Sequence, residues 1–240
     1  MPTQTETVRE IALNQPSSIR VFEQFGIDYC CGGRKPLAVA CTEQNIEIAS
    51  VLAALESAAE APSQGAKDWA SASLESLIEH IVSKHHEYVK RELPRLGTLA
   101  RKVVERHAPN HSELPEIQDA LANLDSELTQ HLGKEERVLF PYIAEFERSL
   151  AGKNPRPHGC FGTVANPIAM MTQEHDAAGA ILADIRKLSG NFSLPEDACP
   201  TYHAFYDGLK EFEQDLHQHI HLENNILFPR SIEMEASEAS

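Results

Sequence analysis

Two segments of the chain share one pattern, and this repeat constrains the fold more than any other feature of the sequence. HLGKEERVLFP begins at His131, and HIHLENNILFP begins at His219. In each segment a Glu stands four residues after the His, and Leu, Phe and Pro follow at positions eight, nine and ten. Residues four apart lie on the same face of an α-helix. The repeat therefore predicts two helices that each present a His and a Glu on one face.

The repeat extends upstream of both segments. His86 lies 45 residues before His131, and His175 lies 44 residues before His219. Each half thus has the order helix with one His, loop, helix with a His-x-x-x-Glu pair. Two copies of such a helical hairpin can assemble into one bundle, and an internal duplication is the simplest origin of the pattern.

Helical periodicity dominates the rest of the chain, and no run shows the alternation of a β-strand. We therefore predict an all-α fold, an antiparallel four-helix bundle preceded by a small helical domain. The long helices are expected at about 73–107, 115–150, 167–189 and 200–233. The predicted domains are a helical unit with a cysteine turn at 1–58, an Ala/Ser-rich linker at 59–72 and the bundle at 73–235.

In all four long helices the repeated polar residues interrupt the apolar face. Burying four His and two Glu without partners would be costly, and a shared metal site relieves that cost. Two carboxylates can bridge two cations, and four His can fill the other positions, two for each metal. Nitrogen and oxygen ligation without thiolate suits non-haem iron, with manganese or zinc as options. The candidate ligands are His86, His131, Glu135, His175, His219 and Glu223.

Other interpretations apply to single residues of this set. A lone His on an apolar face is more often a core residue, and one His-x-x-x-Glu pair can be an intrahelical hydrogen bond; two matched copies favour a metal site. His85 also reaches the apolar face, so the residues leave it open beside His86. Three acidic residues could contact the ligands or be solvated: Glu127, Glu174 and Asp215. Two His fall off the apolar face and are expected to be exposed: His217 and His221.

The stretch DYCCGG contains the vicinal pair Cys30 and Cys31, followed by Gly32 and Gly33. The two glycines permit positive φ angles and a close backbone approach. One interpretation is a redox-active or metal-contacting thiol pair on an exposed turn. The other is two small hydrophobic side chains buried near a turn. The residues alone do not decide between them. Cys160 is expected to be incidental, and Cys41 and Cys199 are expected to be structural.

The net charge, the N-terminal residues and the cysteines narrow the kinds of partner and the cellular location that we expect. The net charge of −15 disfavours nucleic acid and anionic membranes, because both would repel the chain. The N-terminal residues lack the basic and apolar regions of a signal peptide, and no apolar run is long enough to span a bilayer. Five cysteines, an odd number with two adjacent, do not form a secreted disulfide framework. We therefore expect a cytoplasmic protein.

DYCCGG followed by HxxxEExxLFP and HxxLENNxLFPR resembles the iron–sulfur cluster repair di-iron proteins over nearly the whole chain. The resemblance implies a hemerythrin-like bundle with a non-haem di-iron centre, oxo- and carboxylate-bridged, at the six candidate positions. It also favours His86 over His85, because the family's ligand stands directly before an acidic residue. Oxygen-carrying hemerythrins have a fifth His and an HxxxxD motif on the last helix. This chain has HxxxE there, which leaves more open positions on the metal.

The resemblance implies repair of iron–sulfur clusters damaged by nitric oxide or peroxide, by donation of iron. Cys30 and Cys31 would then contact the cluster or act as reductants. Damaged iron–sulfur proteins and a small gas ligand are the expected partners, and a homodimer is an option. An alternative function is binding or reduction of nitric oxide at the di-iron centre, and an oxygen sensor or store ranks last. Whether the protein is an enzyme stays open.

Overall fold

The computed structural model of the protein describes residues 2–60, 68–152 and 157–238. The described residues form helices, turns and one isolated bridge between Thr7 and Pro36, with no β-strand among them. The predicted all-α class is confirmed. Backbone contacts divide the chain into two compact units. Unit 1 is Met1–Ser73 with His217–Arg230, and unit 2 is Leu74–Leu216 with Ser231–Ser240.

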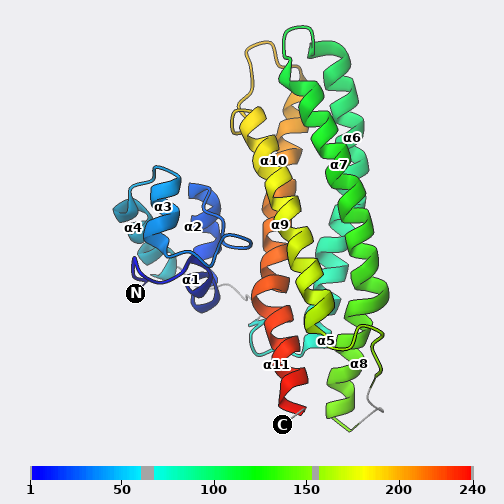
Figure 1. Ribbon diagram of the computed structural model, residues 1–240. Helices are drawn as coiled ribbons and strands as arrows, with labels where there is room; N and C mark the ends of the chain where they lie inside the picture. Colours follow the sequence, from blue (N-terminus) through cyan, green and yellow to red (C-terminus); the bar gives the residue numbers. More distant parts are fainter. Residues whose placement is uncertain (1, 61–67, 153–156, 239–240) are drawn as a thin grey trace. The chain divides into compact units, whose positions relative to one another are not determined.

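Unit 1 begins with four short helices (Figure 1): α1 (Val8–Asn14), α2 (Ser18–Phe25), α3 (Leu37–Glu43) and α4 (Ile48–Glu60). Thr7 starts α1 with a capping box, in which its hydroxyl accepts from the backbone N–H of Glu10. Gly26 ends α2 at a φ of +68°, a conformation that glycine adopts without strain. Helix α3 was not predicted from the sequence.

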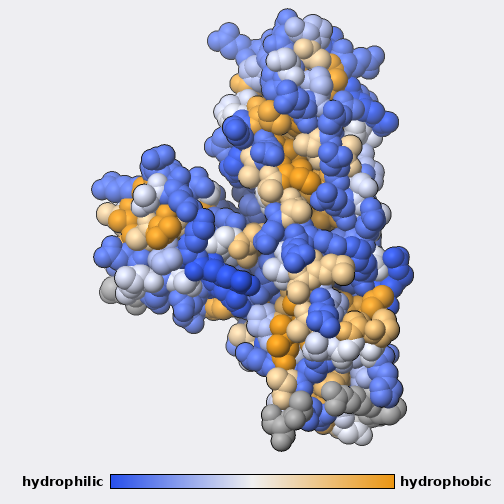
Figure 2. All heavy atoms as spheres, in the orientation of Figure 1, coloured by the Kyte–Doolittle hydropathy of each residue, from blue (hydrophilic) through white to orange (hydrophobic). Residues whose placement is uncertain are grey.

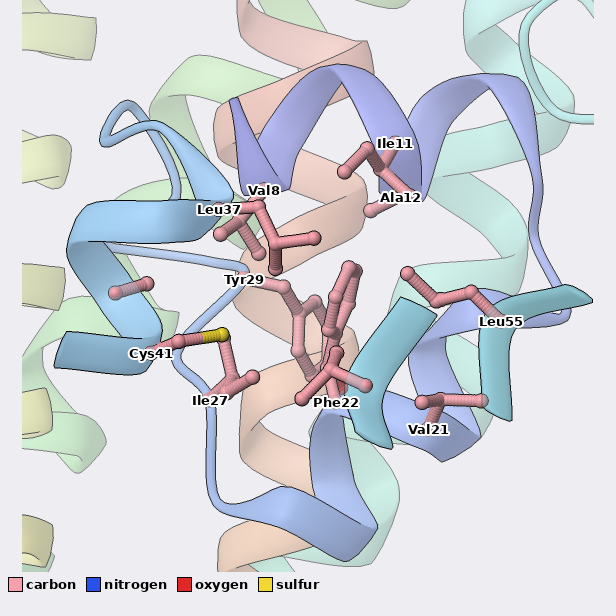
Figure 3. Close-up of a cluster of buried hydrophobic side chains, with 12 residues drawn as sticks. Val8, Ile11, Ala12, Val21, Phe22, Ile27, Tyr29, Leu37, Cys41 and Leu55 are labelled. Atoms are coloured by element: carbon pink, nitrogen blue, oxygen red, sulfur yellow. The ribbon is translucent and has the colours of Figure 1, made fainter. Parts of the chain in front are cut away.

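The apolar faces of these helices enclose one hydrophobic core. Figure 3 shows side chains from different helices that point toward one another around Tyr29. Phe22 and Leu37 are completely buried, and Tyr29 is 1% exposed. Its hydroxyl donates to Glu23 at 3.0 Å, which satisfies the polar end of the ring. This core holds the segment that carries the two vicinal cysteines.

Most of the antiparallel bundle lies in unit 2, and residues 217–230 of its last helices are assigned to unit 1. The helices along this part of the chain are α5 (Leu74–His80), α6 (Glu87–His107), α7 (Glu113–Lys134), α8 (Phe140–Leu150), α9 (Ala165–Leu188), α10 (Pro200–Leu222) and α11 (Phe228–Glu238). Helix α7 packs against α6 and α9. Phe212 of α10 stacks on Tyr88 of α6, and Glu213 of α10 pairs with Arg186 of α9. The long helices α6, α7, α9 and α10 therefore form a four-helix bundle (Figure 1).

Three π-helical turns interrupt the helices of the repeat: η1 (Ile81–His86), η2 (Glu135–Leu139) and η3 (Glu223–Leu227). Pro141 and Pro229 each lie two residues beyond a π turn. A proline has no N–H to donate and its ring clashes with the carbonyl four residues earlier, so a regular α-helix cannot continue through these positions without distortion. Such π turns are frequent at functional sites.

Hydrophilic residues cover most of the face shown in Figure 2, and hydrophobic residues appear there in separate patches. Large apolar side chains that reach the surface are scattered, as with Val138 and Met170. Across the described residues, none of the helices combines the length and the apolar character that crossing a bilayer requires.

Candidate metal centre

The six candidate ligands are all buried. Each has at most 2% of its surface exposed: His86, His131, Glu135, His175, His219 and Glu223. They come from the ends of η1 and α7, from the middle of α9, from the end of α10 and from the first residues of η2 and η3. The π turns thus coincide with the positions that the sequence repeat selects.

The structure brings these side chains into two groups, in which one ligand atom from each residue lies within 4.8 Å of the others. One group is His86, Glu135, His219 and Glu223, and the other is His131, Glu135, His175 and Glu223. Both carboxylates belong to both groups, whereas each imidazole belongs to one. Such an arrangement could hold two adjacent cations, with both carboxylates shared between them and two His for each cation.

Three of the four His side chains turn their Nε2 atoms toward the acidic residues. Nε2 of His86 lies 3.5 Å from Oε2 of Glu135, and Nε2 of His131 lies 3.3 Å from the same oxygen. Nε2 of His219 lies 2.9 Å from Oε1 of Glu223. Nε2 of His131 and Nε2 of His175 are 3.0 Å apart. At this separation the two ring nitrogens are close enough to bind the same cation.

Two of the imidazoles are held from outside by further carboxylates. Nδ1 of His86 lies 2.8 Å from Oε1 of Glu136, and Nδ1 of His131 lies 2.9 Å from Oε2 of Glu174. A carboxylate at Nδ1 accepts its proton, which leaves the Nε2 lone pair for a metal. Burial raises the pKa of both carboxyl groups. Hydrogen bonds from lysine (Lys90 to Glu136 and Lys134 to Glu174) and from the histidines lower the pKa by more than burial raises it, so both pKa values are lower than usual.

The acidic residues considered in the sequence therefore differ. Glu174 contacts a candidate ligand, while Glu127 is exposed on α7. Asp215 pairs with Nδ1 of His85 at 3.0 Å. His85 is thus engaged elsewhere, and His86 is the neighbour of Glu135. Glu136 was missed, although its position directly after Glu135 in the EE pair was a visible signal.

The donor set fits a pair of first-row divalent cations. Neither side-chain oxygen of Glu135 has a hydrogen-bond partner among the described residues, although both are buried. Burying a carboxylate in this state is expensive unless a cation compensates. Four imidazole nitrogens and two carboxylates without thiolate match non-haem iron, manganese or zinc.

The cysteine turn lies in unit 1. Cys30 is 5% exposed, Cys31 is partly exposed, and their sulfur atoms are 3.7 Å apart. The hydrogen bond with Cys31, burial and the carboxylate of Asp28 raise the pKa of the Cys30 thiol well above its usual value. One thiol is therefore buried and protonated at neutral pH, while its neighbour reaches the surface.

Asp28 holds this turn by local hydrogen bonds. Its Oδ1 accepts from the N–H groups of Cys30 and Cys31 at 2.9 and 3.0 Å, and its Oδ2 accepts from Gly32 N–H at 2.8 Å. A Cβ atom on Gly33 would lie 2.6 Å from the Tyr29 carbonyl oxygen. Neither Gly32 nor Gly33 has a positive φ. Of the two roles that the sequence suggested for these glycines, close approach of the backbone is the one that applies, and a positive φ is not.

His221 corrects one expectation. It was predicted to be exposed, but it is 4% exposed and belongs to unit 1. Its ring packs edge-on against Tyr29 at 5.5 Å, and its Nδ1 lies 2.8 Å from the side-chain nitrogen of Asn225. That nitrogen also donates to the Tyr29 carbonyl at 3.1 Å. Burial lowers the pKa of His221 to about 4. Helical periodicity could not reveal a contact with a segment almost 200 residues away.

Two family models match the chain. Residues 77–231 match the hemerythrin HHE cation-binding domain, and residues 4–59 match a domain of unknown function (DUF542). The chain is 36% identical over 232 residues to the iron–sulfur cluster repair protein YtfE of Escherichia coli O81 (strain ED1a), which covers 97% of this chain and 99% of that protein. The proteins of the same description from Citrobacter koseri and Escherichia fergusonii are 35% and 36% identical with the same coverage.

Proposed function

Because the chain belongs to the hemerythrin family with its HHE cation-binding domain, we propose that it holds a di-iron centre and repairs damaged iron–sulfur clusters. The relatives that share about a third of its residues along nearly their whole length are described as iron–sulfur cluster repair proteins. Damage by nitrosative or oxidative stress is the proposed setting, and donation of iron to the cluster is the proposed reaction.

The observation that carries this proposal is the sharing of Glu135 and Glu223 between both groups of candidate ligands. A single-metal site would not require two carboxylates that serve both groups. We assign His86 and His219 to one ion and His131 and His175 to the other, with the two carboxylates between them. Bound iron would offer open coordination positions, and it would be the ion that is donated.

The chain's own residues keep the ions in place and out of water. Glu136 and Glu174 fix the imidazoles of His86 and His131 from their Nδ1 side. Phe140 stacks on the ring of His86 at 5.5 Å, which covers one face of that ligand. Ligands held from two sides lose little entropy when a metal binds. This supports a centre that retains iron until a partner with a higher affinity approaches.

Cys30 and Cys31 are proposed to meet the damaged cluster. Partly exposed Cys31 would make the first contact, and Cys30, 3.7 Å away, would supply the second thiol. Each thiol loses its proton to solvent as its sulfur binds iron. The proposed partners are damaged iron–sulfur proteins in the cytoplasm, and a homodimer stays a prediction.

The test is repair of an aconitase-type enzyme whose cluster has been damaged by nitric oxide. The iron-loaded protein is expected to restore activity above a control with the same concentration of free ferrous iron and a weak chelator. A Cys30→Ser/Cys31→Ser variant should keep its iron and lose most of the repair. Cys160→Ser, which changes an exposed loop cysteine, is the matched control. Repair no better than with free iron would contradict the proposal.

Binding of nitric oxide is the second candidate function. Six protein side chains for two ions leave positions that a small gas can occupy. Titration of reduced, iron-loaded protein with nitric oxide should change its visible absorption with a defined stoichiometry, and the Cys30→Ser/Cys31→Ser variant should respond in the same way. An unchanged spectrum would exclude this activity.

A further inference from the structure

Four side chains meet at the end of the bundle where α6 ends and α10 begins. We call them the bundle-end cluster: His107, the last residue of α6; His111, in the next loop; and Asp197 and Cys199, in the loop before α10. All four belong to unit 2. The proposed function uses none of them.

The donor atoms of the bundle-end cluster face one another. Nε2 of His111 lies 2.9 Å from Oδ1 of Asp197, and Nδ1 of His107 lies 3.9 Å from Oδ2 of the same carboxylate. One ligand atom from each of these three residues lies within 4.8 Å of the others. The Cys199 thiol also interacts with the side chain of His107, although its sulfur lies outside the 4.8 Å grouping of the other three ligand atoms.

Both imidazoles are oriented by their surroundings. The ring of Tyr202 packs edge-on against His107 at 5.3 Å and against His111 at 5.8 Å. Oε1 of Glu113 lies 3.4 Å from Nδ1 of His111, on the side away from Asp197. This repeats the carboxylate support of the central histidines. His107 is 6% exposed, and its Nε2 has no hydrogen-bond partner among the described residues.

We propose that the bundle-end cluster binds one zinc ion, a site separate from the di-iron centre. Two imidazoles, one carboxylate and one thiolate complete a tetrahedral zinc shell. Zinc at about 2.0–2.3 Å from each ligand places the ligand atoms roughly 3.3–3.7 Å apart. His107, His111 and Asp197 already place one ligand atom each within 4.8 Å of the others, and the Cys199 side chain would turn toward them when zinc binds. Zinc would join the loop after α6 to the loop before α10.

Donor chemistry and distance separate the two sites. The bundle-end cluster contains a thiol, whereas the central site has none. His86 directly precedes α6 and His107 is the last of its 21 residues, so they stand about 30 Å apart along one helix. The hydrogen bond from His107 also lowers the pKa of the Cys199 thiol to about 7, which favours the thiolate form. The spacings His-x-x-x-His and Asp-x-Cys are visible in the sequence, but only the fold joins them.

Cobalt(II) is the probe, because it replaces zinc and gives a thiolate-to-metal charge-transfer band that nitrogen and oxygen ligands cannot produce. Cobalt added to the full-length protein, with or without iron, should develop this band to saturation at one ion per chain, and zinc should abolish it. Since the band needs no iron, failure of the di-iron proposal would not affect it. Zinc should also raise the thermal unfolding midpoint.

Matched variants show which thiol gives rise to the charge-transfer band. Cys199→Ser should remove it, and His111→Gln should weaken cobalt binding at least tenfold. Cys31→Ser and Cys160→Ser alter the other thiols that reach the surface and should leave the band unchanged. A band that survives Cys199→Ser, a band that depends on Cys31, or the absence of any band in the unaltered protein would each overturn the zinc site.

Discussion

The candidate metal ligands of the bundle and the thiols of the N-terminal turn are both reactive groups, but the chain positions them in opposite ways. The bundle draws six side chains from positions 86 to 223, and each is at most 2% exposed. The turn is fixed by Asp28 through hydrogen bonds that span only two to four residues, and Cys31 reaches the surface. Ligands drawn from distant segments suit the retention of an ion, whereas a local turn suits the presentation of a thiol to another molecule.

The largest expected effect is on iron binding when a shared carboxylate is removed. Glu135→Met should reduce iron from about two per chain to nearly none, because both cation positions lose a ligand. Glu127→Met, at an exposed position of α7, is the control. Retained iron would show that the site is not carboxylate-bridged.

A smaller effect is expected from the carboxylates behind the imidazoles. Glu136→Gln should weaken iron affinity about 10–100-fold, because it no longer fixes the proton on Nδ1 of His86. Competition with a chelator of known affinity measures the change. Asp215→Gln, which alters the partner of His85 instead, should leave the affinity unchanged. Equal losses in the two variants would mean that His85 and His86 are interchangeable.

Replacing a glycine by alanine should destabilise the cysteine turn but not the bundle helices. Gly33→Ala places a Cβ 2.6 Å from a backbone oxygen and is expected to destabilise unit 1 by about 1–3 kcal/mol. Gly97→Ala in α6 meets no atom within 4 Å and should be neutral or stabilising. Urea unfolding, followed by a probe in each unit, separates the two. An unchanged midpoint for Gly33→Ala would mean that the turn is not closely packed.

The smallest effect is a shift in thiol titration. Alkylation requires the thiolate, so its rate rises with pH through the pKa. In the metal-free protein Cys199 should react with a midpoint near pH 7, and His107→Gln should move this midpoint up by about one unit toward the ordinary value. Cys30, whose pKa is raised, should stay unreactive there. Mass spectrometry of labelled peptides measures both, and faster labelling of Cys30 than of Cys199 would contradict this assignment.

The sequence predicted the helices of the bundle because their apolar faces repeat over many turns, and the regular offsets of His and Glu pointed to one shared site. The short helix α3 was missed, because seven residues carry little periodicity. The π turns were also missed, although Pro141 and Pro229 marked two of them. The predicted domain boundaries stay predictions.

The sequence could not show contacts between distant segments. The burial of His221 depends on Tyr29, and the bundle-end cluster depends on two loops that meet only after folding. Glu136 and Glu174 both stand beside a candidate ligand in the sequence, but only the bundle geometry turns each toward an imidazole on a neighbouring helix. Local patterns identify which residues are reactive, and the fold decides which of them meet.

Iron analysis combined with Mössbauer spectroscopy tests the di-iron centre most directly. The protein reconstituted with isotopically enriched iron should hold two ions per chain in one magnetically coupled centre, and Glu135→Met should lose both while Glu127→Met keeps them. One iron per chain, two uncoupled ions, or a central site filled by zinc in place of iron would contradict the di-iron assignment.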